Sequence, residues 1–247
     1  MGKKITTEKK PRKIAICGTA HSSLFDINDL DRNEWEIWAC NGCWNKEVKY
    51  DFHFELHSIP YLKGLKHENG SPAIAPEYFL WMQENKEKCI LNPNGLPKEY
   101  KGCTEFPIEQ LKERFGDYFT NTIAIMIAYA IMQKDPPTHI SLFGVEMSTV
   151  EEYGDQRACC EAYLYLAAGC GVKITVPEVS SLLKSTHIYG LEEIPANLHT
   201  VIKDIKKAES QVDQMEKLQQ HYKEQTIAAR AVRKYAQDTR KKLSSLT

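Results

Sequence analysis

The sequence predicts a Rossmann-like, doubly wound α/β fold with a mainly parallel sheet, followed by a long C-terminal helix or coiled coil. Short apolar runs typical of buried strands recur along the chain, and helical patterns separate most of them. This alternation favours parallel pairing, because parallel strands need a crossover connection that is usually a helix. Apolar residues at heptad spacing after residue 198 predict the C-terminal helix.

The core elements follow in order along the chain. Each predicted strand is a short apolar run, and several end at a turn residue such as Gly18, Gly144 or Pro177. The predicted strands are 13–17, 35–40, 50–57, 88–91, 139–143 and 172–176. The predicted helices are 24–30, 76–88, 107–115, 121–133 and 156–169. The helix at 121–133 is apolar on nearly every side, so we expect it to be buried.

We divide the chain into a disordered basic tail at 1–12, a Rossmann-like nucleotide-binding domain at 13–195 and a helical segment at 196–247. Residues 58–118 are rich in proline and glycine, and we interpret them as an insertion or lid around the site. The C-terminal seam favours a coiled coil that joins copies into a homo-oligomer. The alternative is a helix that packs back on the core.

Composition excludes several classes of protein. The chain has 247 residues, 42% of them hydrophobic, and a formal net charge of -1, so no overall field attracts nucleic acid or an anionic membrane. No apolar run approaches the ~20 residues that span a bilayer, and no signal-peptide pattern opens the sequence. We therefore expect a cytoplasmic protein whose eight cysteines are reduced. Cys40 and Cys43 lack a second pair at zinc-site spacing, so no metal is expected.

Three turns carry the residues that we expect to bind a nucleotide. The first follows strand 13–17, the second is Asn41-Gly42 after strand 35–40, and the third opens the helix at 121–133. Backbone N–H groups and hydroxyls at such turns suit a phosphate, and a carboxamide can bind a base or ribose. The alternatives are ordinary turns and a simple helix cap. The candidates are Gly18, Thr19, Ser22, Ser23, Asn41, Gly42, Asn121, Thr122 and Gly144.

Polar side chains on the strand at 50–57 form a candidate substrate site. The strand's alternation places His53, Glu55 and His57 on one face. Two imidazoles and a carboxylate can hold a metal, but the more favoured roles are polar contacts to a substrate at a strand's carboxyl end. A satisfied buried network is the remaining alternative.

Charged residues after the strand at 139–143 form the candidate catalytic group. A carboxylate at a strand's carboxyl end can act as a general base, and an arginine can pair with a phosphate. The catalytic candidates are Glu146, Glu151, Glu152, Tyr153 and Asp155, and Gln156 and Arg157 are candidates for substrate binding. The alternative is a polar loop without function.

The order of several short motifs resembles a known family. The motifs are GTAHSSL, IWACN, a Thr/Asn turn before the buried helix, ISLFGVEM and GVKITVPEVSSLL. Together they resemble the family 42 sialyltransferases and the related motility-associated-factor-like proteins. The resemblance implies that Gly18, Ser22, Ser23, Asn41, Asn121 and Thr122 contact a cytidine monophosphate donor. Chains of this type are also similar to uncharacterised phage and prophage proteins, which implies a phage source and a bacterial host cytoplasm.

One departure from the family's pattern bears on the reaction. The family's general base is a histidine in the loop after the strand that ISLFGVEM matches, and residues 151–157 contain none. The expected function is a nucleotide-binding, glycosyltransferase-like enzyme that acts on a nucleotide-sugar and requires no other cofactor. The alternatives are a nucleotide or nucleotide-sugar hydrolase and a non-catalytic binding or assembly module.

Overall fold

The computed structural model describes residues 11–147, 154–185, 188 and 190, and scattered positions between 201 and 233. Contacts divide the chain into two units, Met1–Lys184 and Ser185–Thr247. The first unit holds the whole sheet, and its end precedes the domain boundary that we expected at residue 195. In the second unit the described positions from 201 onward are helical. Several apolar residues of the predicted seam are described and exposed: Val201, Ile205, Val212, Met215 and Tyr222. Leu198 and Leu218 lie outside the described residues, and the coiled coil stays a prediction.

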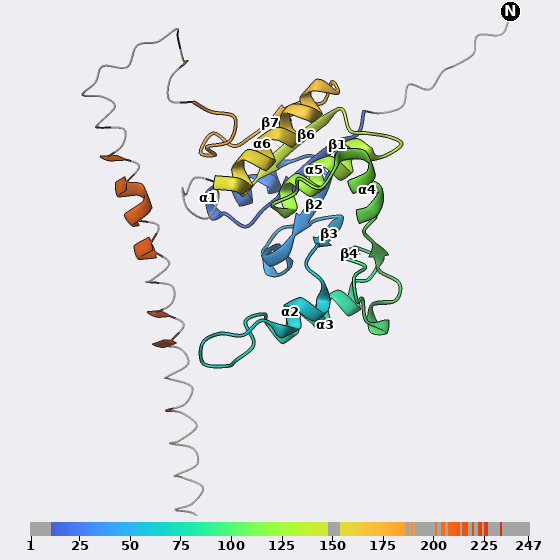
Figure 1. The fold of residues 1–247 in the computed structure, drawn as a ribbon, viewed down its shortest axis with the longest axis vertical. Coiled ribbons are helices and arrows are strands. Elements are labelled where there is room, and N and C mark those ends of the chain that lie inside the picture. Colours follow the sequence, from blue (N-terminus) through green and yellow to red (C-terminus); the bar gives the residue numbers. More distant parts are fainter. Residues whose placement is uncertain are drawn as a thin grey trace, which may run out of the picture. The chain divides into compact units, whose positions relative to one another are not determined.

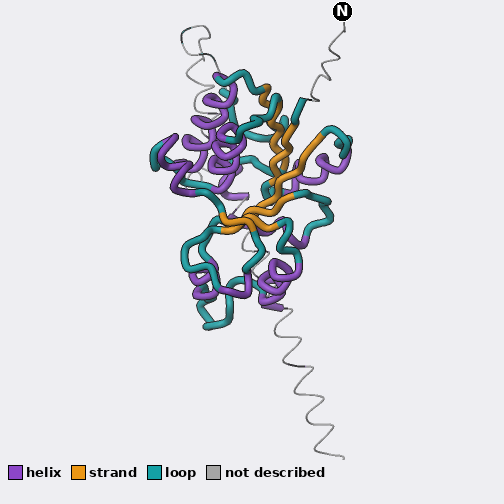
Figure 2. The backbone as a smooth tube through the Cα atoms, turned by 90° about the vertical axis from the view of Figure 1, so that its right-hand side faces the viewer, coloured by secondary structure: helices purple, strands orange, loops and turns teal. Residues whose placement is uncertain are grey.

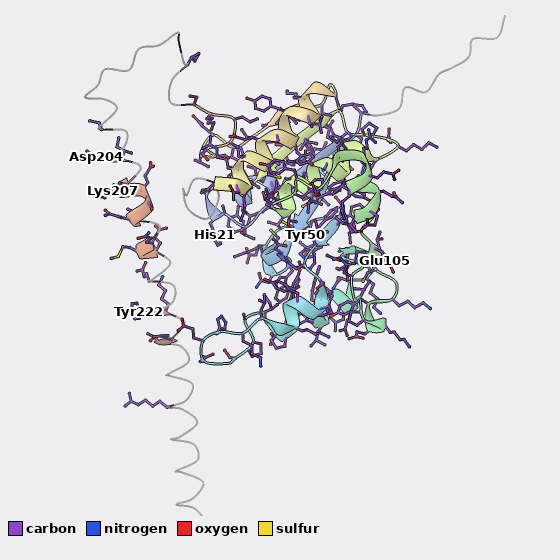
Figure 3. The ribbon with its side chains drawn as sticks, in the orientation of Figure 1. His21, Tyr50, Glu105, Asp204, Lys207 and Tyr222 are labelled. Atoms are coloured by element: carbon purple, nitrogen blue, oxygen red, sulfur yellow. The ribbon has the colours of Figure 1, made fainter. Side chains whose placement is uncertain are left out.

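The first unit is built on one seven-stranded sheet in the order β5-β4-β3-β2-β1-β6-β7. All six neighbouring pairs are parallel, which confirms the predicted fold class. The strands are β1 Lys13–Cys17, β2 Trp35–Cys40, β3 Phe52–Glu55, β4 Cys89–Leu91, β5 Thr104–Glu105, β6 His139–Phe143 and β7 Lys173–Thr175. Glu105, in the edge strand β5, is exposed (Figure 3).

Helices cover both faces of the sheet, which forms the middle layer in Figure 2. One face packs under α4 (Ile108–Phe115), α5 (Thr122–Met132) and α6 (Gly154–Gly169), which lie together in Figure 1. The other face is covered by short elements, because its connections are brief. These are α1 His21–Leu24, η1 Phe25–Asp29, η2 Asn41–Asn45, α2 Ile59–Gly64, α3 Pro76–Glu84 and η3 Lys98–Tyr100.

The alternation of strand side chains decides which residues reach each layer. In β3, Phe54 enters the core beneath α5, while its neighbours His53 and Glu55 point to the opposite face and meet Tyr78 of α3. β3 pairs in parallel with both β2 and β4, so it is an inner strand with polar groups on a buried face. Such groups need hydrogen-bond partners or a ligand.

The strand order reverses between β1 and β6. Successive strands from β1 to β5 add on one side of β1, while β6 and β7 add on the other side. Right-handed crossovers then place the two sets of helices on opposite faces, as observed. In open parallel sheets, ligands bind outside the carboxyl ends of the strands beside such a reversal. A ligand site is therefore expected at the carboxyl edge of β6, β1, β2 and β3.

Two expectations need correction. Residues 58–118 are not a separate insertion, because they supply β4 and β5 to the main sheet; prolines and glycines there mark short connections. The helix expected at 24–30 is instead the single turn α1 followed by the 3-10 helix η1.

The eight cysteines are free thiols. Within the described residues, no helix combines the length and the apolar character needed to cross a membrane.

Candidate functional site

A cavity of about 320 Å³ lies at the carboxyl ends of β2 and β3, between the sheet and α2 and α3. Its polar groups come from the strand ends, at Asn41, Glu55 and His57. Its other walls are aromatic or aliphatic, and the indole of Trp44 stacks on Tyr78 with 5.4 Å between ring centroids. A mostly apolar cavity with a few converging polar groups is the usual form of a small-molecule site. The lining residues are Asn41, Gly42, Trp44, Glu55, His57, Tyr61, Leu62, Leu65, Ala73, Ile74, Ala75 and Tyr78.

Asn41 lines this cavity and carries a buried hydrogen-bond acceptor. It is the first residue of η2 and adopts a left-handed backbone with φ of 48°. Its Oδ1 atom is buried and has no hydrogen-bond partner among the described residues. A buried carbonyl oxygen without a partner costs about 1–3 kcal/mol, so native structures rarely keep one without a reason. A ligand that donates an N–H or O–H to Asn41 would remove that cost.

A chain of hydrogen bonds links the polar residues of β3. The Tyr78 hydroxyl donates to Glu55 Oε2 at 2.9 Å, and His53 Nε2 lies 2.7 Å from the same hydroxyl oxygen. Glu55 Oε1 accepts the backbone N–H of His57 at 3.0 Å and lies 2.7 Å from His57 Nδ1. Because Tyr78 gives its proton to Glu55, His53 Nε2 must be the donor in its own bond. The chain therefore has one direction, from His53 through Tyr78 to Glu55.

Burial and charge shift the pKa values along this chain in opposite directions. His53 is fully buried, and desolvation lowers its pKa to about 4, so it stays neutral near neutral pH. The hydrogen bond to Glu55 raises the pKa of His57, whose side chain is 47% exposed. Burial, followed by the charge of Glu55, raises the pKa of Tyr78 well above its ordinary value. Tyr50 (Figure 3) lies just before β3, and its ring packs against that of His53.

These contacts decide among the sequence-based interpretations of His53, Glu55 and His57. His53 and Glu55 share one face as predicted, but Tyr78 stands between them and the three side chains do not converge on one point. Among the described residues, no three His, Cys, Asp or Glu side chains are arranged to hold a metal ion. β3 ends at Glu55, and His57 lies two residues beyond it. His57 lines the cavity, whereas His53 does not.

The first predicted turn, Gly18 to Ser23, is tied closely to the turn after β6. A Cβ atom on Gly18 would lie 2.5 Å from the carbonyl oxygen of Gly144, and Gly144 itself has φ of +62°. The buried Ser23 hydroxyl accepts the Gly144 N–H at 3.0 Å. The two glycines and Ser23 therefore join β1 to β6, and Thr19, His21 and Ser22 are the exposed side chains of this turn.

The turns after β1 and β2 lie side by side. The Cys43 thiol donates to the carbonyl of Gly18 at 3.0 Å, and a Cβ on Gly42 would lie 3.4 Å from Thr19 Cγ2. His21 opens α1 (Figure 3), and its Nε2 lies 3.3 Å from Lys46 Nζ. Thr19 therefore lies next to Gly42, which belongs to the cavity wall.

The third predicted turn joins the two helices behind it. Asn121 caps α5 by accepting the Ala124 N–H at 2.8 Å, and its Nδ2 donates to the carbonyl of Gln156 at 2.8 Å. Thr120 donates to the carbonyl of Asp155 at 3.1 Å. Asn121 thus fills a structural role, and Thr122 is the first residue of α5.

The residues after β6 divide into three groups. Glu146 is partly buried with no partner for Oε1 among the described residues, and burial raises its pKa. Arg157 is held by Glu161 at 3.0 Å and by the carbonyl of Lys184 at 3.2 Å, which occupies its guanidinium within the fold. Glu151, Glu152 and Tyr153 lie outside the described residues.

Several cavity residues were not predicted from the sequence. Tyr78, Trp44 and Tyr61 line the cavity, yet two of them belong to the segment interpreted as an insertion. Trp44 follows Asn41-Gly42 by two residues, and this nearness to a predicted site residue was the available signal. Nothing in local sequence points to Tyr78, because only the pairing of β3 with α3 brings it to Glu55.

Comparison with known proteins gives one similar structure. No protein-family model and no protein of curated function matches the sequence. The solved structure of the sialyltransferase CstII from Campylobacter jejuni, in complex with the substrate analogue cytidine-5'-monophosphate, is similar with a TM-score of 0.43 and 14% sequence identity. The alignment covers 78% of this chain and 97% of that one. Membership of the family that the motif order resembles stays a proposal.

Proposed function

We propose that this chain binds a nucleotide-sugar of the cytidine monophosphate type and transfers its sugar, as a glycosyltransferase does. The observation that carries the proposal is the buried, unpartnered Oδ1 of Asn41 in an aromatic-walled cavity at the carboxyl edge of the sheet. Edges of this kind are where α/β proteins bind nucleotides.

The chemistry of the cavity supports a cytosine base. Cytosine carries an exocyclic amino group that donates hydrogen bonds, and uracil has a carbonyl oxygen in the same place. In the orientation that the structure gives the carboxamide, Asn41 Oδ1 would accept from the amino group of cytosine, whereas the carbonyl oxygen of uracil would require the amide to turn its Nδ2 inward. The stacked Trp44 and Tyr78 rings supply the apolar surface that a base requires. The motif order that resembles the family 42 sialyltransferases points to the same nucleotide.

The phosphate is assigned to the neighbouring turns. Thr19 lies beside Gly42, Ser22 exposes a second hydroxyl on the same turn, and Lys46, next to His21, adds positive charge there. Hydrogen bonds from hydroxyls and a nearby cation suit a phosphate that becomes the leaving group. Gly18, Ser23 and Gly144 would contribute by shaping this turn, and Asn121 and Thr122 by fixing the start of α5.

A thermal-shift comparison of nucleotides tests the proposal. CMP at 100 times its dissociation constant stabilises the native state by about 2.7 kcal/mol, a rise in Tm of about 5–10 °C for a chain of this size. UMP at the same concentration should give a clearly smaller rise. Asn41→Gly keeps the left-handed backbone accessible while removing the carboxamide, so the CMP shift should disappear. Asn45→Gly, at the exposed far end of η2, is the matched control.

The proposal fails if CMP and UMP raise the Tm of the wild type equally, or if Asn41→Gly binds CMP as the wild type does.

We also propose that residues 198–247 assemble the protein into a homo-oligomer. Mass measured in solution before and after removal of that segment tests the assembly, and an unchanged mass would contradict it.

A further inference from the structure

His57 is held in one orientation at the cavity. Its Nδ1 and its backbone N both bond to Glu55 Oε1, at 2.7 Å and 3.0 Å, and its ring stacks on Tyr61 with centroids 6.0 Å apart. Glu55 accepts at Nδ1, so the neutral ring carries its proton there and its lone pair on Nε2. Within the described part of the chain, Nε2 makes no hydrogen bond, and the ring lines the cavity.

Glu55 is itself fixed by the fold. Its side chain is 2% exposed, and three donors point at its two oxygens: the Tyr78 hydroxyl, the His57 backbone N–H and His57 Nδ1. His53 donates to Tyr78 from behind, so the tyrosine cannot turn its proton away from Glu55. A histidine oriented by a buried carboxylate is the arrangement that prepares an imidazole to take a proton and stabilises the imidazolium that forms.

We infer that His57, oriented by Glu55, is the general base of the transfer reaction. This inference rests on the proposed function. The proton of the attacking hydroxyl, from an acceptor sugar or from water, passes to His57 Nε2. The hydroxyl oxygen forms a bond to the anomeric carbon of the donor, and the bond from that carbon to the phosphate oxygen breaks. Its electron pair leaves with the nucleotide phosphate, and the imidazolium later returns its proton to solvent.

The position of His57 fits this role better than the carboxylates after β6. The titratable groups that face His57 across the cavity are Glu55 from β3, Tyr61 from α2 and Tyr78 from α3. Both tyrosines and Glu55 are engaged as packing or hydrogen-bonding partners, which leaves His57 as the base. The raised pKa of His57 places its protonation nearer to neutral pH than that of a carboxylate. Glu146 does not line the cavity.

The test separates binding from chemistry. The probes are CMP for binding and a CMP-linked sialic acid for turnover. Turnover is measured as released CMP, which forms whether the sugar is transferred to an acceptor sugar or to water. His57→Gln should bind CMP within about two-fold of the wild type and lose about 10²- to 10⁴-fold in turnover. His67→Gln, an exposed histidine between α2 and α3, should match the wild type in both. Glu146→Gln should retain turnover within a few-fold.

Glu55→Gln tests the positioning role. Without the carboxylate the His57 pKa falls, so the acidic limb of the pH–rate profile should move to lower pH while the maximal rate drops. Nitrogen-15 NMR of the wild-type imidazole gives a readout independent of activity, and it should show the Nδ1–H tautomer.

Full turnover in His57→Gln, or an Nε2–H tautomer for His57, would overturn the assignment. So would a wild type that binds CMP and releases none from the CMP-linked sugar. A wild type that does not bind CMP would instead refute the proposed function itself.

Discussion

Replacing Tyr78 by phenylalanine removes one hydroxyl from the centre of the hydrogen-bond chain. That hydroxyl donates to Glu55 at 2.9 Å and lies 2.7 Å from His53 Nε2, and the tyrosine is 4% exposed. The ring itself keeps its volume and its stacking on Trp44. The change therefore isolates two buried hydrogen bonds with little change in packing.

The cost follows from what each partner loses. Glu55 loses one of three donors, and a hydrogen bond to a charged group contributes about 1.5–3 kcal/mol. His53 is fully buried, so its Nε2–H is left without an acceptor, at about 1–3 kcal/mol. Partial relaxation reduces the sum, and we expect Tyr78→Phe to destabilise the fold by about 3 kcal/mol. For a chain of 247 residues this lowers Tm by about 6–12 °C.

Urea unfolding followed by circular dichroism measures this change. The midpoint should fall with an unchanged slope, because the surface exposed on unfolding stays the same. Tyr61→Phe is the matched control, since Tyr61 lines the same cavity but is 56% exposed. A loss below about 0.5 kcal/mol, the size of an ordinary surface substitution, would refute the hydrogen-bond chain.

Three further predictions concern stability. Gly18→Ala should destabilise the fold by about 1–3 kcal/mol, because the new methyl group would lie 2.5 Å from a backbone carbonyl oxygen. Gly64→Ala, where the new methyl group meets open space, should leave the Tm unchanged or raise it. Equal Tm values for the two variants would contradict this. The pKa of His53 is about 4 in the folded state against 6.5 when unfolded, so the free energy of unfolding falls by about 3 kcal/mol as pH falls from 6.5 to 4. The raised pKa of His57 has the opposite effect: its contribution to stability is complete below pH 6.5 and is lost as pH rises through the raised, folded-state pKa. Urea titrations of His53→Gln and His57→Gln against pH should each lose one of these slopes, and variants that keep the wild-type profile would exclude the shifts. Asn121→Ala should cost about 1–2 kcal/mol through the lost cap of α5, and an unchanged Tm would show that the cap contributes nothing.

The sequence predicted the central strands well because they contain short apolar stretches, and several of them end in a turn residue. β5 was missed, since two exposed residues, Thr104 and Glu105, carry no apolar signal. The edge strand is defined by pairing with β4, which only the folded sheet provides.

The candidate site was predicted in part, for a physical reason that differs between residues. Asn41 follows β2 directly and His57 lies two residues beyond the end of β3, so local sequence places them at the carboxyl edge. Ser23 ends the turn after an expected strand and Asn121 opens an expected helix, yet their side chains bond to Gly144 and Gln156 within the fold. Polarity at a turn cannot separate these two outcomes, because a cap, a tie between loops and a ligand contact use the same chemical groups.

Isothermal titration of CMP and UMP into the wild type and Asn41→Gly measures the nucleotide preference of the cavity. We expect the wild type to bind CMP, UMP to bind at least ten-fold more weakly, and Asn41→Gly to lose this discrimination, since one well-placed hydrogen bond is worth about 1.4 kcal/mol or more in a buried site. Equal affinity of the wild type for both nucleotides, or no binding of either, would contradict this expectation.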